Sequence, residues 1–350
     1  MSILRIAIAG AGLIGQRHLE LIQANPSCEL AALVDPATAA RDVAQRAGVS
    51  LFPSLEALFE SDRPDGIILA TPNQLHVEQA LVCLQAGVAA LIEKPVAHTL
   101  EEGERLLAAS RDSKVPLLVG HHRAHSPILQ RAREIIREGR LGSLVAVMGS
   151  ALFYKPEDYF DAAPWRRKAG GGPVLINLIH EVGNLRSLCG EIVAVQALAS
   201  SATRGFPVED TVSISLRFAN GALGSFLLSD TAASARSWEQ TSRENRDYPS
   251  YDDEDCYLIA GTSGSLAVPT MRLKRYDQPE GHSWWKPFTC EVADLQREDP
   301  LARQLEHFCQ VIRGEAEPLV SARDGLQNLR VVDAIGRAAR DGGTVVVVSG

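Results

Sequence analysis

The chain has 350 residues, of which 45% are hydrophobic and 22% charged, and its formal net charge is −8. This composition is typical of a globular protein of about two domains, and it excludes disordered, collagen-like and low-complexity classes. The acidic balance and the lack of a long apolar segment argue against nucleic-acid and membrane partners. No secretory signal is evident and the six cysteines form no Cys-x-x-Cys pair. We therefore expect a soluble, cytoplasmic protein with reduced thiols and no metal site.

Short apolar runs alternate with helical patterns in the first third of the chain. Thr99 and Glu102 form a capping-box pair at the start of one of the predicted helices. Strands are predicted at 3–9, 30–34, 66–70, 89–92 and 117–119, with a shorter segment at 51–52. This alternation predicts a doubly wound parallel sheet with right-handed crossovers, and therefore an α/β Rossmann domain over residues 1–122.

The pattern changes after residue 122, where strands follow one another with few helices between them. Helices are predicted at 127–138, 301–312 and 324–340, and strands at 144–148, 193–199, 212–218, 222–229 and 344–348. Such an order favours an antiparallel or mixed sheet, so we expect an α+β domain over residues 123–350. Its C-terminal helices can pack back on the first domain. The polar residues 236–255 are predicted to form a long loop.

A glycine motif, Gly10-Ala11-Gly12-Leu13-Ile14-Gly15, follows the first predicted strand and opens a predicted helix. Gly10 permits a tight turn, Gly12 lets the backbone approach a pyrophosphate, and Gly15 allows close helix–strand packing. The amides at the helix start, those of Leu13 and Ile14 included, then face the phosphates. Asp35 ends the second strand, where its carboxylate can bind the ribose 2′-hydroxyl and would repel a 2′-phosphate. NAD is therefore the predicted cofactor, and NADP is the alternative because Arg17 and Arg41 are near in sequence.

Two polar segments follow apolar strands, Thr71-Pro72-Asn73-Gln74-Leu75-His76 and, one helix later, Glu93-Lys94-Pro95. Both segments project from the carboxyl edge of the predicted sheet, where open α/β sheets bind ligands. With the glycine motif, the Gly170–Gly172 turn, His180 and the C-terminal helices, they resemble the glucose–fructose oxidoreductase and inositol dehydrogenase family, the Gfo/Idh/MocA dehydrogenases. The resemblance covers nearly the whole chain.

The resemblance implies a second domain with a large, mostly antiparallel sheet whose outer face forms a subunit interface, and hence a homodimer or homotetramer. It also implies that Lys94 lies beside the nicotinamide, where its amine can bind the reacting oxygen and exchange a proton as hydride moves. Glu93 would orient Lys94 or contact the cofactor. The other cofactor contacts that we expect are Thr71, Pro72, Asn73, His76 and Arg123.

A third segment starts at Gly170-Gly171-Gly172-Pro173 and continues as a helical pattern to His180. Members of the resembled family commonly carry Asp four residues before this histidine, but the chain has Ile176 there, which cannot accept a proton. Asn177, three residues before His180, can share its helical face and hydrogen-bond the substrate. We therefore expect Lys94 and His180 to handle the proton and Asn177 to position the substrate.

The chain is predicted to be an NAD(P)-dependent dehydrogenase that transfers a hydride between nicotinamide and a secondary alcohol or ketone of a sugar, cyclitol or related polyol. The same chemistry on a non-carbohydrate cyclic diol or on an imine is the first alternative. A non-catalytic NAD-binding sensor is an alternative of another class, and the presence of Lys94 and His180 disfavours it.

Overall fold

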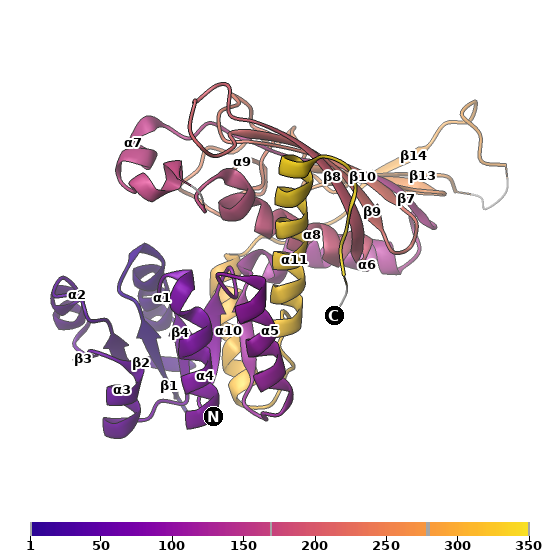
Figure 1. Ribbon diagram of the computed structural model, residues 1–350. Coiled ribbons are helices and arrows are strands. Elements are labelled where there is room, and N and C mark those ends of the chain that lie inside the picture. The colour runs from indigo at the N-terminus through magenta and orange to yellow at the C-terminus, as the bar shows by residue number, and fades with distance from the viewer. Residues whose placement is uncertain (1, 169, 278–280, 349–350) are drawn as a thin grey trace. The chain divides into compact units, whose positions relative to one another are not determined.

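The computed structural model describes residues 2–168, 170–277 and 281–348, and the chain separates into two compact units (Figure 1). Unit 1 comprises the residues up to His125 together with Pro300–Leu329. Unit 2 comprises Ser126–Asp299 and the residues from Arg330 onward. Each unit is therefore assembled from two separate segments of the chain.

Unit 1 is built on a six-stranded parallel sheet with the strand order β3-β2-β1-β4-β5-β6. The strands are β1 (Leu4–Ala9), β2 (Cys28–Val34), β3 (Ser50–Phe52), β4 (Gly66–Leu69), β5 (Ala89–Glu93) and β6 (Leu117–Gly120). Every residue of β4, β5 and β6 is buried, as expected for parallel strands that are covered on both faces. This strand order confirms the predicted Rossmann fold.

Helices of unit 1 pack in two groups. Helix α1 contacts α10, whereas α4 contacts both α3 and α5. Their bounds are α1 (Leu13–Ala24), α2 (Ala40–Ala47), α3 (Leu55–Ser61), α4 (His76–Ala86), α5 (Leu100–Arg111) and α10 (Pro300–Ile312), with 3-10 turns at Asn73–Leu75 and His122–His125. The predicted capping box starts α5, because Thr99 Oγ1 accepts from the Glu102 amide and Glu102 Oε2 accepts from the Thr99 amide, both at 3.2 Å.

Unit 2 is built on a nine-stranded sheet with the order β14-β13-β12-β11-β7-β10-β9-β8-β15. The strands are β7 (Leu144–Leu152), β8 (Ile192–Ser200), β9 (Thr211–Phe218), β10 (Leu223–Ser229), β11 (Tyr257–Gly261), β12 (Gly264–Val268), β13 (Arg272–Arg275), β14 (Thr289–Val292) and β15 (Val345–Val346). Strands β7 and β10 pair in parallel and all the other neighbours pair antiparallel, which confirms the predicted mostly antiparallel sheet.

One face of this sheet carries the core of unit 2, formed with α6 (Pro127–Arg137), α8 (Ile179–Cys189) and the later part of α11 (Ala322–Asp341). Inward-facing residues such as Val147, Ile214 and Phe226 alternate with outward-facing ones along the strands. Two short helices, α7 (Glu157–Asp161) and α9 (Trp238–Thr241), lie in the connections. Among the helices that the structure describes, none is long and apolar enough to cross a membrane.

The prediction of a loop over residues 236–255 is only partly right. Helix α9 forms within it, and Trp238 and Ser242 are fully buried. The indole Nε1 of Trp238 donates to Glu244 Oε2 at 2.9 Å, so a large apolar ring anchors the first half of this polar segment. The terminal strand is also shorter than predicted, since β15 spans only Val345–Val346.

Candidate functional site

The glycine turn between β1 and α1 contains two glycines that the fold requires and one that it does not. Gly10 has a φ of +95°, and a Cβ there would lie 2.5 Å from the carbonyl oxygen of Ala70. A Cβ on Gly15 would lie 1.9 Å from the carbonyl oxygen of Gly10. By contrast, a Cβ on Gly12 would meet no atom within 4 Å. The turn therefore leaves open space at Gly12, where the amino end of α1 begins.

Asp35 stands at the end of β2 and joins two backbone segments. Its Oδ2 accepts from the Ala11 amide and its Oδ1 from the Ala37 amide, both at 2.8 Å. Each oxygen keeps a lone pair for a ribose hydroxyl. Arg17, one of the two residues that could favour a 2′-phosphate, is paired with Glu20 at 2.8 Å.

His76 connects the two polar segments that follow β4 and β5. Its Nδ1 lies 2.8 Å from the carbonyl oxygen of Pro95, and its Nε2 lies 2.9 Å from that of Thr71. Burial lowers the pKa of His76, while the two carbonyl groups act in the opposite direction. The ring thus holds the Thr71–Pro72 turn and the Lys94–Pro95 turn together as a single rim. Each ring nitrogen lies within hydrogen-bond distance of a backbone carbonyl group, and the contact of His76 with a cofactor stays a prediction.

Glu93 is buried directly before Lys94 and bonds to His18 of α1, with 2.8 Å between Glu93 Oε1 and His18 Nε2. Burial alone would raise the pKa of Glu93, but the His18 hydrogen bond and the charges of His18, Lys94 and His122 outweigh it and hold the pKa at about 2. A carboxylate therefore stays ionised behind the lysine, whose own amide lies 3.2 Å from Glu93 Oε2. The Lys94–Pro95 peptide is cis.

The predicted cofactor residues of unit 1 lie at or after the carboxyl ends of β1, β2, β4, β5 and β6, and the strand order of this sheet reverses between β1 and β4. Arg123 lies in the 3-10 turn that follows β6 and is buried. The others are Gly10, Gly12, Leu13, Ile14, Gly15, Asp35, Thr71, Pro72, Asn73, His76, Glu93 and Lys94. Open space at Gly12, uncapped amides at the start of α1 and a carboxylate at the end of β2 fit a dinucleotide.

In unit 2, the segment before His180 is not the regular α-helix that the sequence suggests. Val174–Leu178 forms a π-helix, and α8 begins only at Ile179. A π-helix has a wider turn, so α-helical spacing does not describe the relation of Asn177 to His180. The Asn177 side chain contacts Lys155, whose Nζ donates to Asn177 Oδ1 at 2.7 Å.

Lys155 is a residue that the sequence analysis missed. It follows β7, is buried, and lies 3.7 Å from Asp230 Oδ2 and 4.8 Å from the centroid of the Tyr159 ring. Burial lowers the pKa of Lys155 to about 8; Arg166 and Arg204 add to this effect, and Asp230 opposes it. The sequence does contain a signal, because Lys155-Pro156 repeats the pattern of Lys94-Pro95, a lysine and a proline just after a strand.

His180 lies in the first turn of α8 and is buried. The next residue, Glu181, accepts a hydrogen bond from the Tyr257 hydroxyl of β11, and the same hydroxyl accepts from Asn184 Nδ2 at 2.9 Å. These bonds attach the first two turns of α8 to the sheet. His180 is therefore held on a fixed element rather than on a loop.

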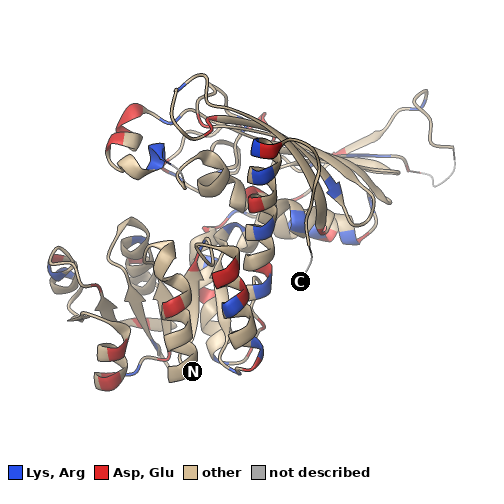
Figure 2. Cartoon of the chain, in the orientation of Figure 1, with Lys and Arg blue, Asp and Glu red and all other residues tan. Residues whose placement is uncertain are grey.

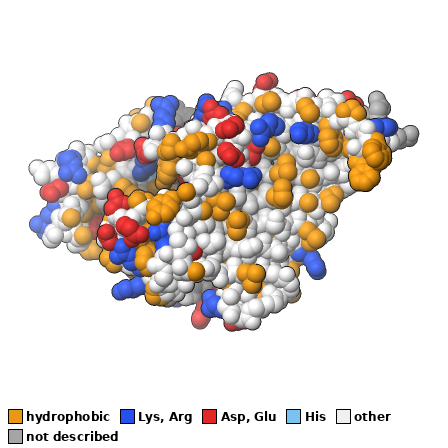
Figure 3. All heavy atoms as spheres, turned by 90° about the horizontal axis from the view of Figure 1, so that it is seen from above, with side chains coloured by type: hydrophobic (Ala, Val, Ile, Leu, Met, Phe, Trp, Pro, Cys, Tyr) orange, Lys and Arg blue, Asp and Glu red, His pale blue; other side chains and the backbone are white. Residues whose placement is uncertain are grey.

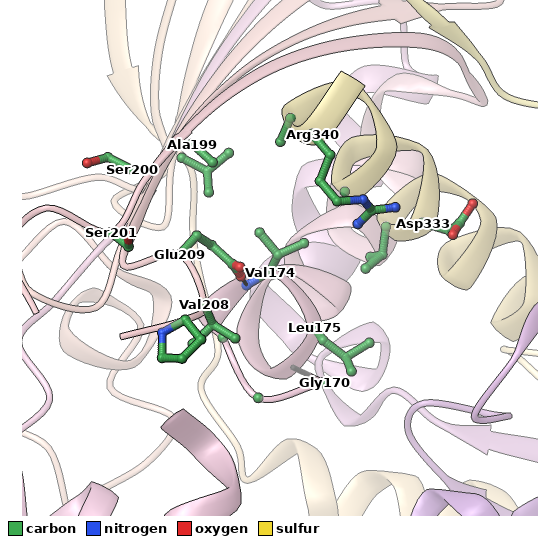
Figure 4. Close-up of a pocket in the computed structure, with 17 residues that line it drawn as sticks. Gly170, Val174, Leu175, Ala199, Ser200, Ser201, Val208, Glu209, Asp333 and Arg340 are labelled. Carbon is green, nitrogen blue, oxygen red and sulfur yellow. Dashed lines mark hydrogen bonds between the residues drawn. The ribbon is translucent and has the colours of Figure 1, made fainter. Parts of the chain in front are cut away.

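A cavity of about 480 Å³ lies in unit 2 behind the Gly170–Gly172 turn (Figure 4). Glu209 and Arg340 project from two different walls, the β8–β9 connection and α11. Glu209 Oε1 accepts from the Val174 amide at 3.0 Å, and burial raises the pKa of this carboxyl. Glu209 thus holds the start of the π-helix that carries Asn177.

Two family models match the chain. Residues 4–121 match that of an oxidoreductase family with an NAD-binding Rossmann fold, and residues 129–267 match that of the GFO/IDH/MocA C-terminal domain.

Known proteins resemble the chain over most of its length. The 1,5-anhydro-D-fructose reductase of Ensifer adhaerens is 28% identical over 307 residues, which cover 85% of this chain and 84% of that protein. The inositol 2-dehydrogenase of Rhizobium meliloti is 24% identical over 344 residues, covering 96% and 97%. Among solved structures, the WlbA dehydrogenase of Bordetella pertussis, in complex with NADH and UDP-GlcNAcA, superposes with a TM-score of 0.79 at 27% identity over 99% of both chains.

Proposed function

Because this chain belongs to the Gfo/Idh/MocA family of NAD(P)-dependent oxidoreductases, whose domain models match in both of its units, we propose that it is an NAD-dependent dehydrogenase of a sugar, cyclitol or related polyol. The observation that carries this proposal is the rim at the carboxyl edge of the parallel sheet. There His76 joins the turn after β4 to the turn after β5, which bears Lys94. Strand β5 lies two strands away from β1, after which Gly12 leaves room for a cofactor.

The proposed cofactor contacts are made by the predicted residues of unit 1. The amides of Leu13 and Ile14 would receive the pyrophosphate, and Asp35 would accept from the ribose hydroxyls. Arg123 and the turn from Thr71 to His76 would enclose the remainder. Bound NAD would supply the hydride acceptor for oxidation of the alcohol.

The proposed proton chemistry belongs to Lys94 and His180. Lys94 exchanges a proton with the reacting oxygen, and the ionised Glu93 directly before it accepts from its backbone amide and so fixes the turn that carries it. His180 assists this proton exchange. An amide does not titrate, so Asn177 positions the substrate by a hydrogen bond and exchanges no proton. Ile176 supplies no acid or base.

The test is a fluorescence titration with NADH and NADPH, followed by a screen for absorbance change at 340 nm with NAD or NADP and a panel of polyols. We expect tighter binding of NADH and turnover on at least one sugar or cyclitol. Preference for NADPH would overturn the assignment of Asp35. Turnover confined to cyclic dihydrodiols or imines would overturn the polyol substrate, and binding without turnover on any compound would favour a sensor.

We also propose that the outer face of the nine-stranded sheet joins two copies of the chain. Strands β7, β8, β10 and β11 carry no charged residue, and Figure 2 shows this part of the sheet almost entirely tan. Apolar side chains point outward from it and are exposed, with small residues between them (Figure 3): Met148, Leu198, Leu223, Leu227 and Leu258. Exposed apolar surface on a regular sheet favours a self-complementary interface.

Replacement of Met148 by Glu should therefore lower the native mass measured by light scattering. Met148 pairs with Leu258 on the central strands, so a carboxylate there would be buried without a partner at the interface. Leu319→Glu, at an exposed apolar residue of unit 1, is the matched control and should leave the mass unchanged. A wild-type protein that is monomeric at micromolar concentration would overturn this proposal.

A cytoplasmic location is proposed as well. The structure shows all six cysteines as free thiols, of which Cys290 is exposed. An exposed free thiol is most compatible with a reducing compartment.

A further inference from the structure

We propose that Lys155 is a positioning residue of the substrate site, whose ammonium group binds the Asn177 oxygen and so orients the NH₂ group of this amide as a hydrogen-bond donor toward the substrate. The inference rests on the proposed function, because it assumes that Asn177 faces the substrate. It starts from one contact, the 2.7 Å hydrogen bond between Lys155 Nζ and Asn177 Oδ1.

The chemistry of the two groups decides the orientation of the amide. A protonated lysine has three donors and no acceptor, so only the oxygen of an amide can face it. The NH₂ group of Asn177 must then point away from Lys155. Asn177 can consequently present its NH₂ group as a donor to a substrate oxygen, whether of a hydroxyl, a carbonyl or a sugar ring, while its own oxygen is bound by Lys155.

The surroundings keep Lys155 in place while lowering its affinity for the proton. Its ammonium group lies 4.8 Å from the Tyr159 ring centroid and 5.5 Å from that of Phe153, so two aromatic faces flank it. The nearest carboxylate, Asp230, also binds Arg204, with 3.0 Å between Arg204 Nε and Asp230 Oδ1. Asp230 therefore divides its charge between two cations and compensates the buried lysine only in part.

Arg166 is the other cation near this lysine, since its guanidinium carbon lies 3.8 Å from the Tyr159 ring centroid. Three charged groups thus act on the pKa of Lys155: Arg166 and Arg204 lower it and Asp230 raises it. Together with burial, they give Lys155 a pKa of about 8.

Deprotonation would remove the constraint on the amide. A neutral amine carries a lone pair and can accept from the Asn177 NH₂ group as well as donate to its oxygen. Both orientations of the amide then become possible, and the substrate loses a defined donor. Since Lys155 is protonated below its pKa and neutral above it, substrate binding and turnover should be full below about pH 7 and fall as the pH rises through about 8.

The first experiment observes the titration itself and needs no substrate. The chain has six lysines, so ¹³C-labelled lysine gives six Cε signals, which Lys155→Arg assigns by the loss of one. We expect that signal to titrate near pH 8 rather than near 10.4, and Asn177→Asp to raise its midpoint by about one pH unit or more, because a carboxylate would face the ammonium group. A Lys155 midpoint near 10.4 that Asn177→Asp leaves unchanged would overturn the contact.

The second experiment uses turnover on whichever substrate the polyol screen identifies. Lys155→Met should lower kcat/KM by about 10–100-fold, because Asn177 loses the partner that orients it. Lys155→Arg keeps a pure donor, so it should retain kcat/KM within about threefold at pH 7 and abolish the fall near pH 8. Lys114→Met, at an exposed lysine of unit 1, is the matched control and should change neither value.

The outcomes separate this inference from the proposed function. Lys155→Met with kcat/KM within twofold of wild type and an unchanged pH profile would overturn the inference alone. Failure of every polyol to react would count against the proposed function, while the titration of Lys155 would still decide whether it binds Asn177. If Lys155→Met does not fold, the pH profile of Lys155→Arg carries the test.

Discussion

Replacement of Lys94 by Ala is expected to lower kcat by about 10²–10⁴-fold while the Kd for NAD changes by less than about threefold. The lysine follows β5 at the carboxyl edge of the sheet, directly after the ionised Glu93. His76 holds the turn that carries the lysine. These contacts hold the backbone around Lys94, while its side chain is only half-buried and is therefore suited to exchange a proton with a bound substrate. The measurement is steady-state kinetics together with an NAD binding titration of the same preparation.

Lys94→Arg distinguishes proton exchange from the effect of a positive charge. Guanidinium keeps the positive charge and the hydrogen bond but does not release its proton at any working pH, so alcohol oxidation should remain as slow as in Lys94→Ala. Lys114→Ala, at an exposed lysine of the same unit, should leave kcat unchanged. A loss below tenfold in Lys94→Ala would remove this residue from the acid–base role.

Replacement of Gly12 by Ala should weaken cofactor binding and leave the stability of the fold almost unchanged. The added methyl group meets no protein atom within 4 Å, so the free energy of unfolding without cofactor should change by less than about 1 kcal/mol. The same methyl group would occupy the space that the pyrophosphate needs, so we expect the Kd for NADH to rise by at least about tenfold. Thermal unfolding without cofactor and NADH fluorescence measure the two quantities.

Gly15→Ala is the matched comparison within the same motif. Its Cβ would lie 1.9 Å from the carbonyl oxygen of Gly10, so the backbone must shift and the protein should lose about 1–3 kcal/mol of stability or more even without cofactor. Equal stability losses in the two variants, or unchanged NADH binding in Gly12→Ala, would contradict the assignment of Gly12 to the cofactor.

Each unit contains one charged residue with a shifted pKa that bears on the pH dependence of activity. Glu93, with a pKa of about 2, stays ionised across the working range, whereas Lys155 changes charge near pH 8. We therefore attribute a loss of activity centred near pH 8 to Lys155, and Lys155→Arg tests that attribution directly.

Local patterns in the sequence sufficed for most of the elements. The apolar runs of β1, β4 and β5 are buried parallel strands, and the Thr99–Glu102 pair starts α5 as a capping box. Strands β11–β14 were not predicted, because they are short and β13 and β14 present exposed polar residues. The segment before His180 was predicted as an α-helix, but it is a π-helix. Backbone hydrogen bonds in a π-helix span five residues instead of four, a difference that leaves the pattern of apolar residues almost unchanged.

The sequence by itself determined the family, the cofactor-binding turn and the lysine and histidine proposed for catalysis, since each depends on residues that are adjacent or regularly spaced. Only the tertiary structure decided which polar groups meet. His18 and Glu93 are 75 positions apart, and Lys155 and Asn177 are 22 apart, on elements whose proximity follows from sheet order and helix packing. The low pKa of Lys155 has the same origin, because burial and the neighbouring charges arise only when distant segments pack around one side chain.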